Sequence, residues 1–497
     1  MIARARDLLA ASVVLAVAGC AVGPDFHPPA KPTQTGYLPA GADVATTDAA
    51  PGALGAAQRL TPGADIAGEW WTLFRSPALD ALVRRALAHN PQLPAAQAAL
   101  RAAHENTAAQ IGSYYPQVGA GLTVSRNLTP LASLSPVGAS NNPYYSLTTA
   151  SVSVSFLPDV FGLNQRTVEG LAATADTQRW QVEATYLTLT SNVVAAAFTE
   201  ASLAAQIEET EEIVGIGQKL TSILRQEFAL GQIAQADVRT QEAALALAQQ
   251  SLGPLQKQRA QARDQLAALV GATPDQSLPS FALTDFTLPT ELPLSLPADL
   301  VAQRPDLQAA LANLHAASAQ IGVAIAQRLP QFPLSAQGGR EPNNIADLFE
   351  PHTAFWSLIG SATLPIFQGG TLLHRQRAAQ AGFDQAAAQY DQAVLAALQN
   401  VADTLAALHI DATTLGSAQA AQSAAEDSLR IARGQLALGS VSTLVLLNAQ
   451  DAALTARLAT VQAQAARLSD TAALFQALGG GWWHRHDIPA PPSKAPF

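Results

Sequence analysis

The chain has 497 residues, of which 48% are hydrophobic, 13% charged and 6% aromatic, with a formal net charge of −10. This acidity argues against a nucleic-acid partner, because phosphate binding relies on clustered Lys and Arg. Long intervals rich in Ala, Leu and Gln favour helices. No stretch reaches the roughly 18–20 apolar residues of a membrane-spanning helix. We therefore expect long, thin helices, and any membrane crossing is expected to use strands.

The N-terminus has the order of a bacterial lipoprotein signal peptide. Arg4 and Arg6 precede an apolar run, and small residues then lead to Cys20, the chain's sole cysteine. This order predicts removal of residues 1–19, with diacylglycerol and an N-acyl group added to Cys20. The alternative is a stray cysteine after an ordinary secretory signal, although a lone cysteine has no internal disulfide partner. Ala21, rather than aspartate, follows the cysteine and points to the outer membrane.

Residues 20–68 are rich in Pro, Gly, Ala and Thr and predict an extended, lipid-anchored segment. A first repeat (69–270) begins at Trp70 and Trp71, where apolar residues at helical spacing start. We interpret both tryptophans as core packing rather than as a ligand site.

Two stretches of the first repeat, about 117–126 and 147–157, alternate apolar and small polar residues with period two. They flank a segment rich in Ser, Asn and Pro and predict a β-hairpin with one apolar face. Two interpretations remain open: the face packs inside a soluble sandwich, or it contacts lipid as part of a barrel wall. The lipoprotein signal favours the barrel. Four strands cannot close a conducting barrel, and lipid does not tolerate an open edge, so oligomerisation is expected.

After the hairpin, residues from about 163 to 230 contain no proline and predict a helix about 100 Å long. Such a helix must pack lengthwise against others, as in coiled coils. Gly231 interrupts the pattern before a helix resumes at 236–270. Because glycine caps helix C-termini, we expect a helical hairpin with its tip near residue 231.

The second half of the chain repeats this plan. Asn90-Pro91 is echoed 214 positions later by Arg304-Pro305, and Gly231 is echoed 208 positions later by Gly439. A period of this size indicates two copies of one unit rather than a solenoid. The remaining ranges are a periplasmic linker (271–297), repeat 2 (298–481; strands about 331–337 and 355–365, helical tip near 439) and a C-terminal tail (482–497).

The sequence contains no metalloprotease, nucleophile-elbow, P-loop or paired-cysteine motif. We therefore predict no catalytic residue, no metal site and no cofactor apart from the covalent lipid. Two functions are weighed against an enzyme: a passive export duct driven by a partner pump, and a lipid-anchored coiled-coil scaffold or adhesion protein. The apolar alternating residues discriminate between them, because the duct requires a lipid-facing set: Val152, Val154, Phe156, Trp356 and Leu358.

Together these features resemble the TolC-like outer-membrane efflux proteins, in particular the lipoprotein branch that serves resistance-nodulation-division pumps. The resemblance extends from the lipidated cysteine nearly to the C-terminus. The matching motifs are Cys20-Ala21-Val22-Gly23-Pro24-Asp25-Phe26, Trp70-Trp71-x-x-Phe74, Asn90-Pro91-Gln92-Leu93, Leu157-Pro158-Asp159-Val160-Phe161-Gly162, Arg304-Pro305-Asp306-Leu307, Leu364-Pro365-Ile366-Phe367-Gln368-Gly369-Gly370 and Ala477-Leu478-Gly479-Gly480-Gly481-Trp482.

The resemblance implies a mixed α and β membrane protein assembled as a homotrimer. Its twelve-stranded barrel would cross the outer-membrane lipid, and its helices would form a periplasmic α-helical barrel. The implied function is an export duct for small toxic compounds or drugs. The implied partners are a periplasmic adaptor (membrane fusion) protein and an inner-membrane pump. An outer-membrane component of type I protein secretion is the alternative.

Two sets of residues carry over by position from the family. The tips expected to dock the adaptor comprise Leu230, Gly231, Gln232, Ile233, Leu438, Gly439, Ser440 and Val441. The periplasmic gate candidates are Asp237, Arg239, Val445 and Asn448. The family commonly has aspartate where this chain has Asn448, and three asparagines around an axis would repel one another less than three aspartates. An alternative for Asp237 is a solvated carboxylate at a helix start.

Overall fold

A computed structural model describes residues 21–34, 36–38, 46–128 and 144–485, and it divides into two compact units. Unit 1 consists of Met1–Pro29, Ala99–Gln178 and Ala310–Tyr390. Unit 2 consists of Ala30–Ala98, Arg179–Ala309 and Asp391–Phe497. Each unit therefore contains segments from both halves of the chain, and several long helices contribute residues to both.

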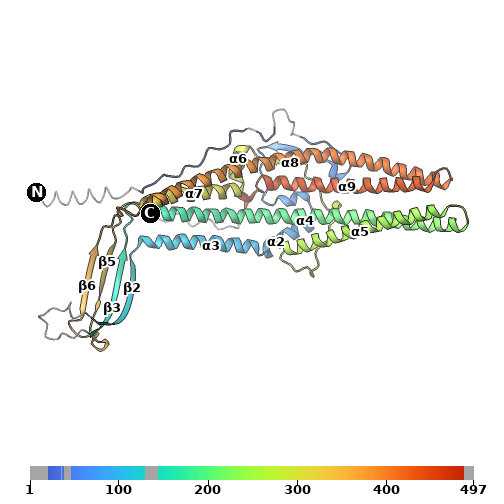
Figure 1. The fold of residues 1–497 in the computed structure, drawn as a ribbon. Coiled ribbons are helices and arrows are strands. Elements are labelled where there is room, and N and C mark those ends of the chain that lie inside the picture. The colour runs from blue at the N-terminus through green and yellow to red at the C-terminus, as the bar shows by residue number, and fades with distance from the viewer. Residues whose placement is uncertain (1–20, 35, 39–45, 129–143, 486–497) are drawn as a thin grey trace. The chain divides into compact units, whose positions relative to one another are not determined.

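Unit 1 contains a four-stranded antiparallel sheet in the order β2-β3-β5-β6, whose strands lie side by side in Figure 1. The strands are β2 (Gln117–Leu128), β3 (Tyr144–Phe156), β5 (Leu334–Arg340) and β6 (Ala354–Gly360). The pairing of β3 with β5 joins the hairpin of the first half to the hairpin of the second. Among the described residues, β2 and β6 each keep one edge without a partner strand.

The register gathers the apolar side chains on one face of this sheet, because directly paired residues point to the same side. One row aligns Val118, Val154, Ala336 and Leu358, and the next aligns Ala120, Val152, Gly338 and Trp356. The opposite face carries small polar rows, such as Gly119, Ser153, Gln337 and Ser357. The sequence alternation therefore correctly predicted two faces of different polarity.

The second hairpin departs from the predicted bounds. Strands were expected at about 331–337 and 355–365, whereas β5 begins at Leu334 and continues to Arg340, and β6 ends at Gly360. Pro333 lacks an N–H and interrupts the ladder. Pairing then resumes beyond it, since the backbone N–H of Gln331 donates to Thr363 O at 2.9 Å and that of Thr363 donates back at 2.8 Å. The predicted ranges therefore included the isolated pair of Gln331 and Thr363, which lies beyond the ends of β5 and β6.

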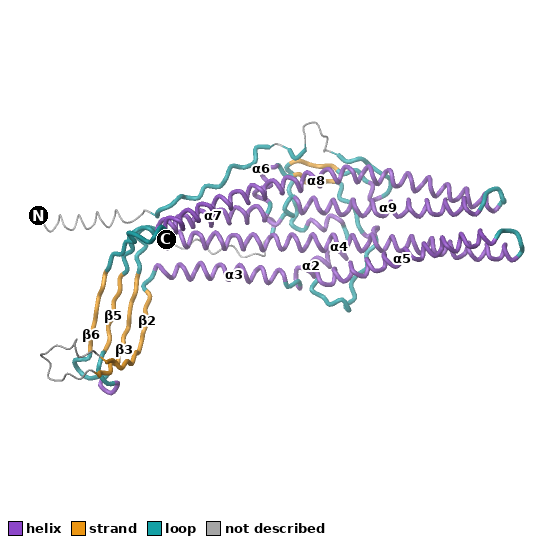
Figure 2. Tube along the Cα trace, viewed as in Figure 1, coloured by secondary structure: helices purple, strands orange, loops and turns teal. Residues whose placement is uncertain are grey.

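Four long helices occur as two pairs of equal length. Both α4 (Leu163–Ala229) and α8 (Thr371–Ala437) have 67 residues, whereas α5 (Gln235–Leu269) and α9 (Thr443–Ala477) each have 35. Figure 2 shows helix along each of them, with loops at their ends. These bounds agree with the predicted helical intervals to within one residue. Near the second tip, α8 and α9 pack through small and branched side chains, which are Leu429, Ala432, Leu446, Ala449 and Ala453.

Unit 2 has a conventional aromatic core at the start of the first repeat. Trp70, Trp71 and Phe74 have at most 1% of their surface exposed. Trp70 stacks on Phe475 of α9 at 5.4 Å, and Phe74 meets Phe198 of α4 edge to face at 4.9 Å. The interpretation of the tryptophans as core residues is confirmed. Unit 2 has several shorter elements, including the one that carries these tryptophans. They are η1 (Ala53–Gly55), β1 (Arg59–Pro62), η2 (Trp70–Phe74), α2 (Pro77–His89), η5 (Leu283–Asp285), β4 (Glu291–Leu294), α6 (Pro297–Gln303) and η7 (Trp482–His484).

The N-terminal segment is more structured than the predicted extended tether. Its strand β1 pairs in parallel with β4 of the 271–297 linker. Arg467 of α9 is completely buried and donates to the carbonyl oxygens of Leu54 and Ala56. Gln58 donates to the Thr471 hydroxyl at 2.9 Å. Residues 46–62 therefore pack against unit 2 as part of its fold.

Helix α3 (Gln92–Ile111), the short η3 (Gly112–Tyr114), α7 (Pro305–Ala326) and η6 (Ile345–Asp347) complete the described elements. By length and composition, α7 and α8 are apolar enough to cross a membrane. This corrects the expectation that no stretch reaches that threshold. Both helices are rich in alanine, and half of the α7 window is buried, so the test is weak evidence for helical spans.

Candidate functional site: an exposed apolar sheet and two helical tips

The apolar face of the sheet is uncovered. Val118 is 70% exposed, Trp356 82% and Leu358 74%. In a soluble sandwich these side chains would pack against a second sheet, and no such layer lies on them among the described residues. Burying so much apolar surface requires lipid or another chain. Of the predicted lipid-facing residues, Val152, Val154 and Phe156 on β3 share this face with Trp356 and Leu358 on β6.

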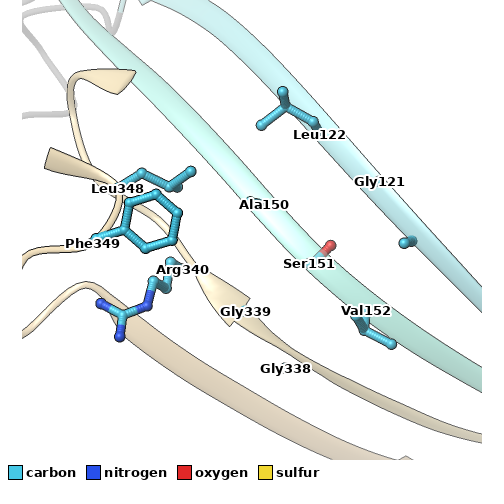
Figure 3. A pocket seen from close by; sticks show the side chains of 11 residues that line it. Gly121, Leu122, Ala150, Ser151, Val152, Gly338, Gly339, Arg340, Leu348 and Phe349 are labelled. Atoms are coloured by element: carbon cyan, nitrogen blue, oxygen red, sulfur yellow. The ribbon is translucent and has the colours of Figure 1, made fainter. Parts of the chain in front are cut away.

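On β5 the apolar face ends in a charged residue. Arg340 lies in the row of Leu122, Ala150 and Ala354, and its guanidinium donates to the Glu350 carbonyl oxygen at 2.9 Å. Figure 3 shows Leu348 and Phe349 beside it, bordering a shallow hollow of about 560 Å³ on the sheet. A charge bound to one loop carbonyl, next to the exposed Phe349, is typical of the point where a strand leaves the apolar band, since aromatic girdles occur there.

Both helical tips end in the same glycine cap. Gly231 and Gly439 have φ of +71° and +66°, in the left-handed region that favours glycine. At the first tip Gln232 N–H donates to Glu227 O, and at the second Ser440 N–H donates to Gln435 O, which is the Schellman pattern. The sequence prediction of a glycine-capped hairpin is confirmed at both positions.

The tips present apolar side chains to solvent. Leu230 is 74% exposed and Leu438 is 84% exposed. The next residues, Gln232 and Ser440, are also exposed, whereas Ile233 and Val441 are half-buried. A Cβ added to Gly231 or Gly439 would have no neighbour within 4 Å. The predicted docking residues are therefore accessible in a single chain.

The four gate candidates are not brought together as a linked group within one chain. Asp237 accepts from its own helix start, at Ala234 N (3.3 Å), as the alternative interpretation predicted. Arg239 pairs with Glu242 at 2.7 Å, and Arg225 of α4 pairs with the same carboxylate at 2.6 Å. Hydrogen bonds from Arg225 and then Arg239 hold the pKa of Glu242 below its usual range. In a single chain, then, the polar contact of Arg239 goes to Glu242 rather than to Asp237.

Val445 and Asn448 lie on α9 with exposed side chains. Asn448 lines a groove of about 560 Å³ between α5 and α9, where Leu247 is 66% exposed and Leu444 56% exposed. Its lining also includes Leu447 and Leu454 of α9.

Sequence reasoning missed an ion-pair network that links the two helical hairpins. Arg457 of α9 lies 3.2 Å from Glu209 and 2.9 Å from Glu212, both on α4, and 2.8 Å from Glu426 on α8. Its side chain is 20% exposed. The only sequence signal was the spacing of Glu209 and Glu212, which places both carboxylates on one helix face. No sequence pattern identified Arg457 on α9 as the partner of these carboxylates.

The comparisons with known proteins agree with this architecture. The sequence matches the family described as outer membrane efflux protein over residues 82–272 and 296–480, which is most of the chain. The chain belongs to the outer membrane efflux protein family. It is an outer-membrane component of an efflux pump with a large periplasmic part.

Two relatives and one solved structure support this family assignment. The antibiotic efflux pump outer membrane protein ArpC of Pseudomonas putida is 28% identical over 484 residues, which cover 97% of this chain and 96% of ArpC. The toluene efflux pump outer membrane protein TtgC of Pseudomonas putida matches with the same identity and coverage. The solved structure of the outer-membrane channel OprN has a TM-score of 0.81 at 25% identity and covers 93% of this chain and 100% of its own. The mixed helical and β fold is thus that of an outer-membrane efflux channel.

Cys20, the predicted lipidation site of this efflux protein, lies outside the described residues. Residue 21 is the first described, and it continues directly into a segment docked on unit 1.

Proposed function

We propose that this efflux protein works as a homotrimer whose copies complete one twelve-stranded barrel. The observation that carries the proposal is the four-stranded sheet with one exposed apolar face and free edges on β2 and β6. Unpaired backbone groups are not tolerated in lipid, so each β6 edge must pair with the β2 edge of another copy. Three copies would supply twelve strands, and the polar rows would then line a water-filled interior.

The strand lengths suit this role. β2 has 12 residues and β3 has 13, more than the roughly 9–11 residues that a tilted transmembrane strand needs. β5 and β6 have seven each, and the extra pairing of Gln331 with Thr363 lengthens their ladder at one end. The sheet is therefore long enough to cross the hydrocarbon layer.

In this proposal the long helices form the periplasmic tunnel, and the exposed tips dock a periplasmic adaptor that connects to an inner-membrane pump. The gate would be built from residues near the tips, with Asp237, Arg239, Val445 and Asn448 meeting equivalents in neighbouring copies. Lipid on Cys20 would supplement the barrel as an anchor. The names of the relatives, which specify antibiotic and toluene efflux, favour small toxic organic compounds as cargo.

The test is assembly and conductance of the acylated protein purified from outer membranes. Native mass spectrometry should find three copies, and planar lipid bilayers should show conductance. Cysteine pairs placed on the outer edges of β2 and β6 should form disulfides between chains, giving a covalent trimer on non-reducing gels. A monomer or dimer that inserts without conductance would overturn the proposal.

A further inference from the structure

The first described residues of the chain form a docked segment rather than a loose tether. We call residues 21–26 the neck. The backbone N–H of Val22 donates to Phe161 O at 3.2 Å. The guanidinium of Arg166 donates to Val22 O at 3.1 Å, to Gly23 O at 3.3 Å and to Asp25 Oδ1 at 2.8 Å. Phe161 and Arg166 flank the start of α4, so the neck is tied to the turn that follows β3.

The seat of the neck is buried and polar. The side chain of Arg166 is only 6% exposed, and its remaining charge is balanced by Glu169 at 2.7 Å. Glu169 in turn lies 2.9 Å from His315 of α7, whose ring stacks on Phe26 with centroids 4.5 Å apart. The carboxylate of Asp25 is 82% exposed, so its ion pair contributes little by itself, and the buried Arg166 holds the neck through the carbonyl oxygens of Val22 and Gly23. The neck is therefore held at two places: Arg166 binds its backbone, and His315 stacks on Phe26.

The backbone of the neck lies very close to the backbone of its seat at two glycines. A Cβ at Gly162 would lie 2.7 Å from Ala21, and a Cβ at Gly23 would lie 2.5 Å from the Cα of Gly322. Both Gly162 and Gly23 have positive φ, at +76° and +101°. Real Cβ atoms do not approach so closely, so any larger residue would displace the neck.

The first described residue lies beside the turn between β3 and α4. Ala21 packs against Gly162, which follows the last residue of β3, Phe156, by six positions. Cys20 precedes Ala21 in the sequence, so an acyl group on Cys20 would be attached one residue before this contact. A flexible linker would instead let the lipid explore a wide region.

We propose that Arg166 is a positioning residue that locks the acylated N-terminus to the base of β3, so that the lipid anchor sets the depth of the sheet in the membrane. This inference rests on the proposed lipidation of Cys20. Arg166 acts through the neck and touches no cargo. By fixing the anchor to the base of β3, Arg166 would make barrel assembly depend on the anchor. An anchor on a free tether would not have this effect.

The first test measures the neck itself in the purified acylated protein. His27 is exposed and directly follows the neck, and acylation leaves no other free thiol in the chain, so a spin label at His27→Cys reports neck mobility. We expect an immobilised spectrum in the parent and several-fold faster motion in Arg166→Ala. Phe26→Ala, which alters the neck and leaves the α4 seat intact, should also increase mobility. Arg84→Ala removes an exposed arginine with two ion pairs and is the matched control with unchanged mobility. An immobilised label in both Arg166→Ala and Phe26→Ala would overturn the inference.

The second test separates positioning from plain stability. Arg166→Ala is made in the acylated chain and in a Cys20→Ser chain that carries a non-lipoprotein signal peptide, and the yield of outer-membrane oligomer is compared. We expect a several-fold loss in the acylated chain and little further loss in the unacylated one. An equal fold loss in both contexts would show a structural role only and overturn the inference. Absence of the acyl group by mass spectrometry would also overturn it, while conductance of the same preparation would leave the proposed channel standing.

Discussion

An arginine at Val152 would place a charge in the middle of the apolar face of the sheet. Val152 lies on β3 in the row of Ala120, Gly338 and Trp356, and it is 50% exposed. This row lies between the row of Val154 and the row that contains Ala150 and Arg340. An arginine at the midplane of a barrel wall costs about 2–4 kcal/mol, and Val152→Arg should therefore lower the folding equilibrium in lipid roughly 30- to 700-fold per chain.

The neighbouring residue provides the matched control. Ser153 lies on the opposite face, in the row of Gly119, Gln337 and Ser357, where an arginine would face water inside the proposed barrel. Val124 provides a depth control, because it shares the apolar face but lies closer to the loop end, near Arg126. There the cost of arginine should fall to about 0–1 kcal/mol.

The assay is urea titration of each variant folded into lipid vesicles, together with the yield of heat-resistant oligomer in outer membranes. The expected order of loss is Val152→Arg, then Val124→Arg, then Ser153→Arg. Equal stability of Val152→Arg and Ser153→Arg would refute the assignment of the apolar face to lipid. A larger loss at Ser153 would show that the sheet is oriented the other way round.

Two further predictions concern the helical part. Gly231→Trp and Gly439→Trp should each cost only about 1–2 kcal/mol of stability from left-handed backbone strain, because no atom lies near the added Cβ. Both variants should abolish drug efflux while leaving trimer in the membrane, and Gly253→Trp, in the middle of α5 with open space around its Cβ, is the control. Full efflux in both tip variants would exclude docking there. Burial, together with a hydrogen bond that the protonated Asp411 carboxyl donates to Asp470, raises the pKa of Asp411 to about 7 from 3.8. The folded state then retains a proton that the unfolded chain releases, so the free energy of unfolding falls as pH rises from 3.8 to about 7. Asp411→Asn should flatten this slope in urea titrations between pH 4 and pH 8. An unchanged slope would contradict retention of the proton by Asp411 in the folded state.

Local patterns predicted the regular elements well. Alternation with period two placed Val152 and Leu358 on one face, and the absence of proline from 163 to 229 marked one of the two longest helices. Glycine identified both tips, since only glycine adopts the left-handed conformation at Gly231 and Gly439 without strain. These signals depend on a few neighbouring residues, which is why a single sequence reveals them.

Contacts between distant segments were not predictable in the same way. The buried Arg467 donates to the carbonyl oxygens of Leu54 and Ala56, and backbone groups leave no trace in sequence. The neck was predicted to be part of an extended tether, because its proline and glycine content is that of a linker. Its order comes from Arg166, which lies more than 140 positions further along the chain. The gate candidates do not contact one another within one chain, and in the proposed trimer their partners would belong to other copies.

The matched lengths of the helices have a consequence for how such a chain can change. Helices of 67 and 35 residues recur in both halves, and each residue adds about 1.5 Å of axial reach. A deletion of one heptad from each of α4 and α5 would withdraw the first tip by about 10 Å from the level of the second. An adaptor that spans both tips would then meet a step instead of a level rim. An insertion or deletion in the helices of one half should therefore be tolerated only with a matching change in the other half. The length of each helical hairpin thus constrains the length of the other.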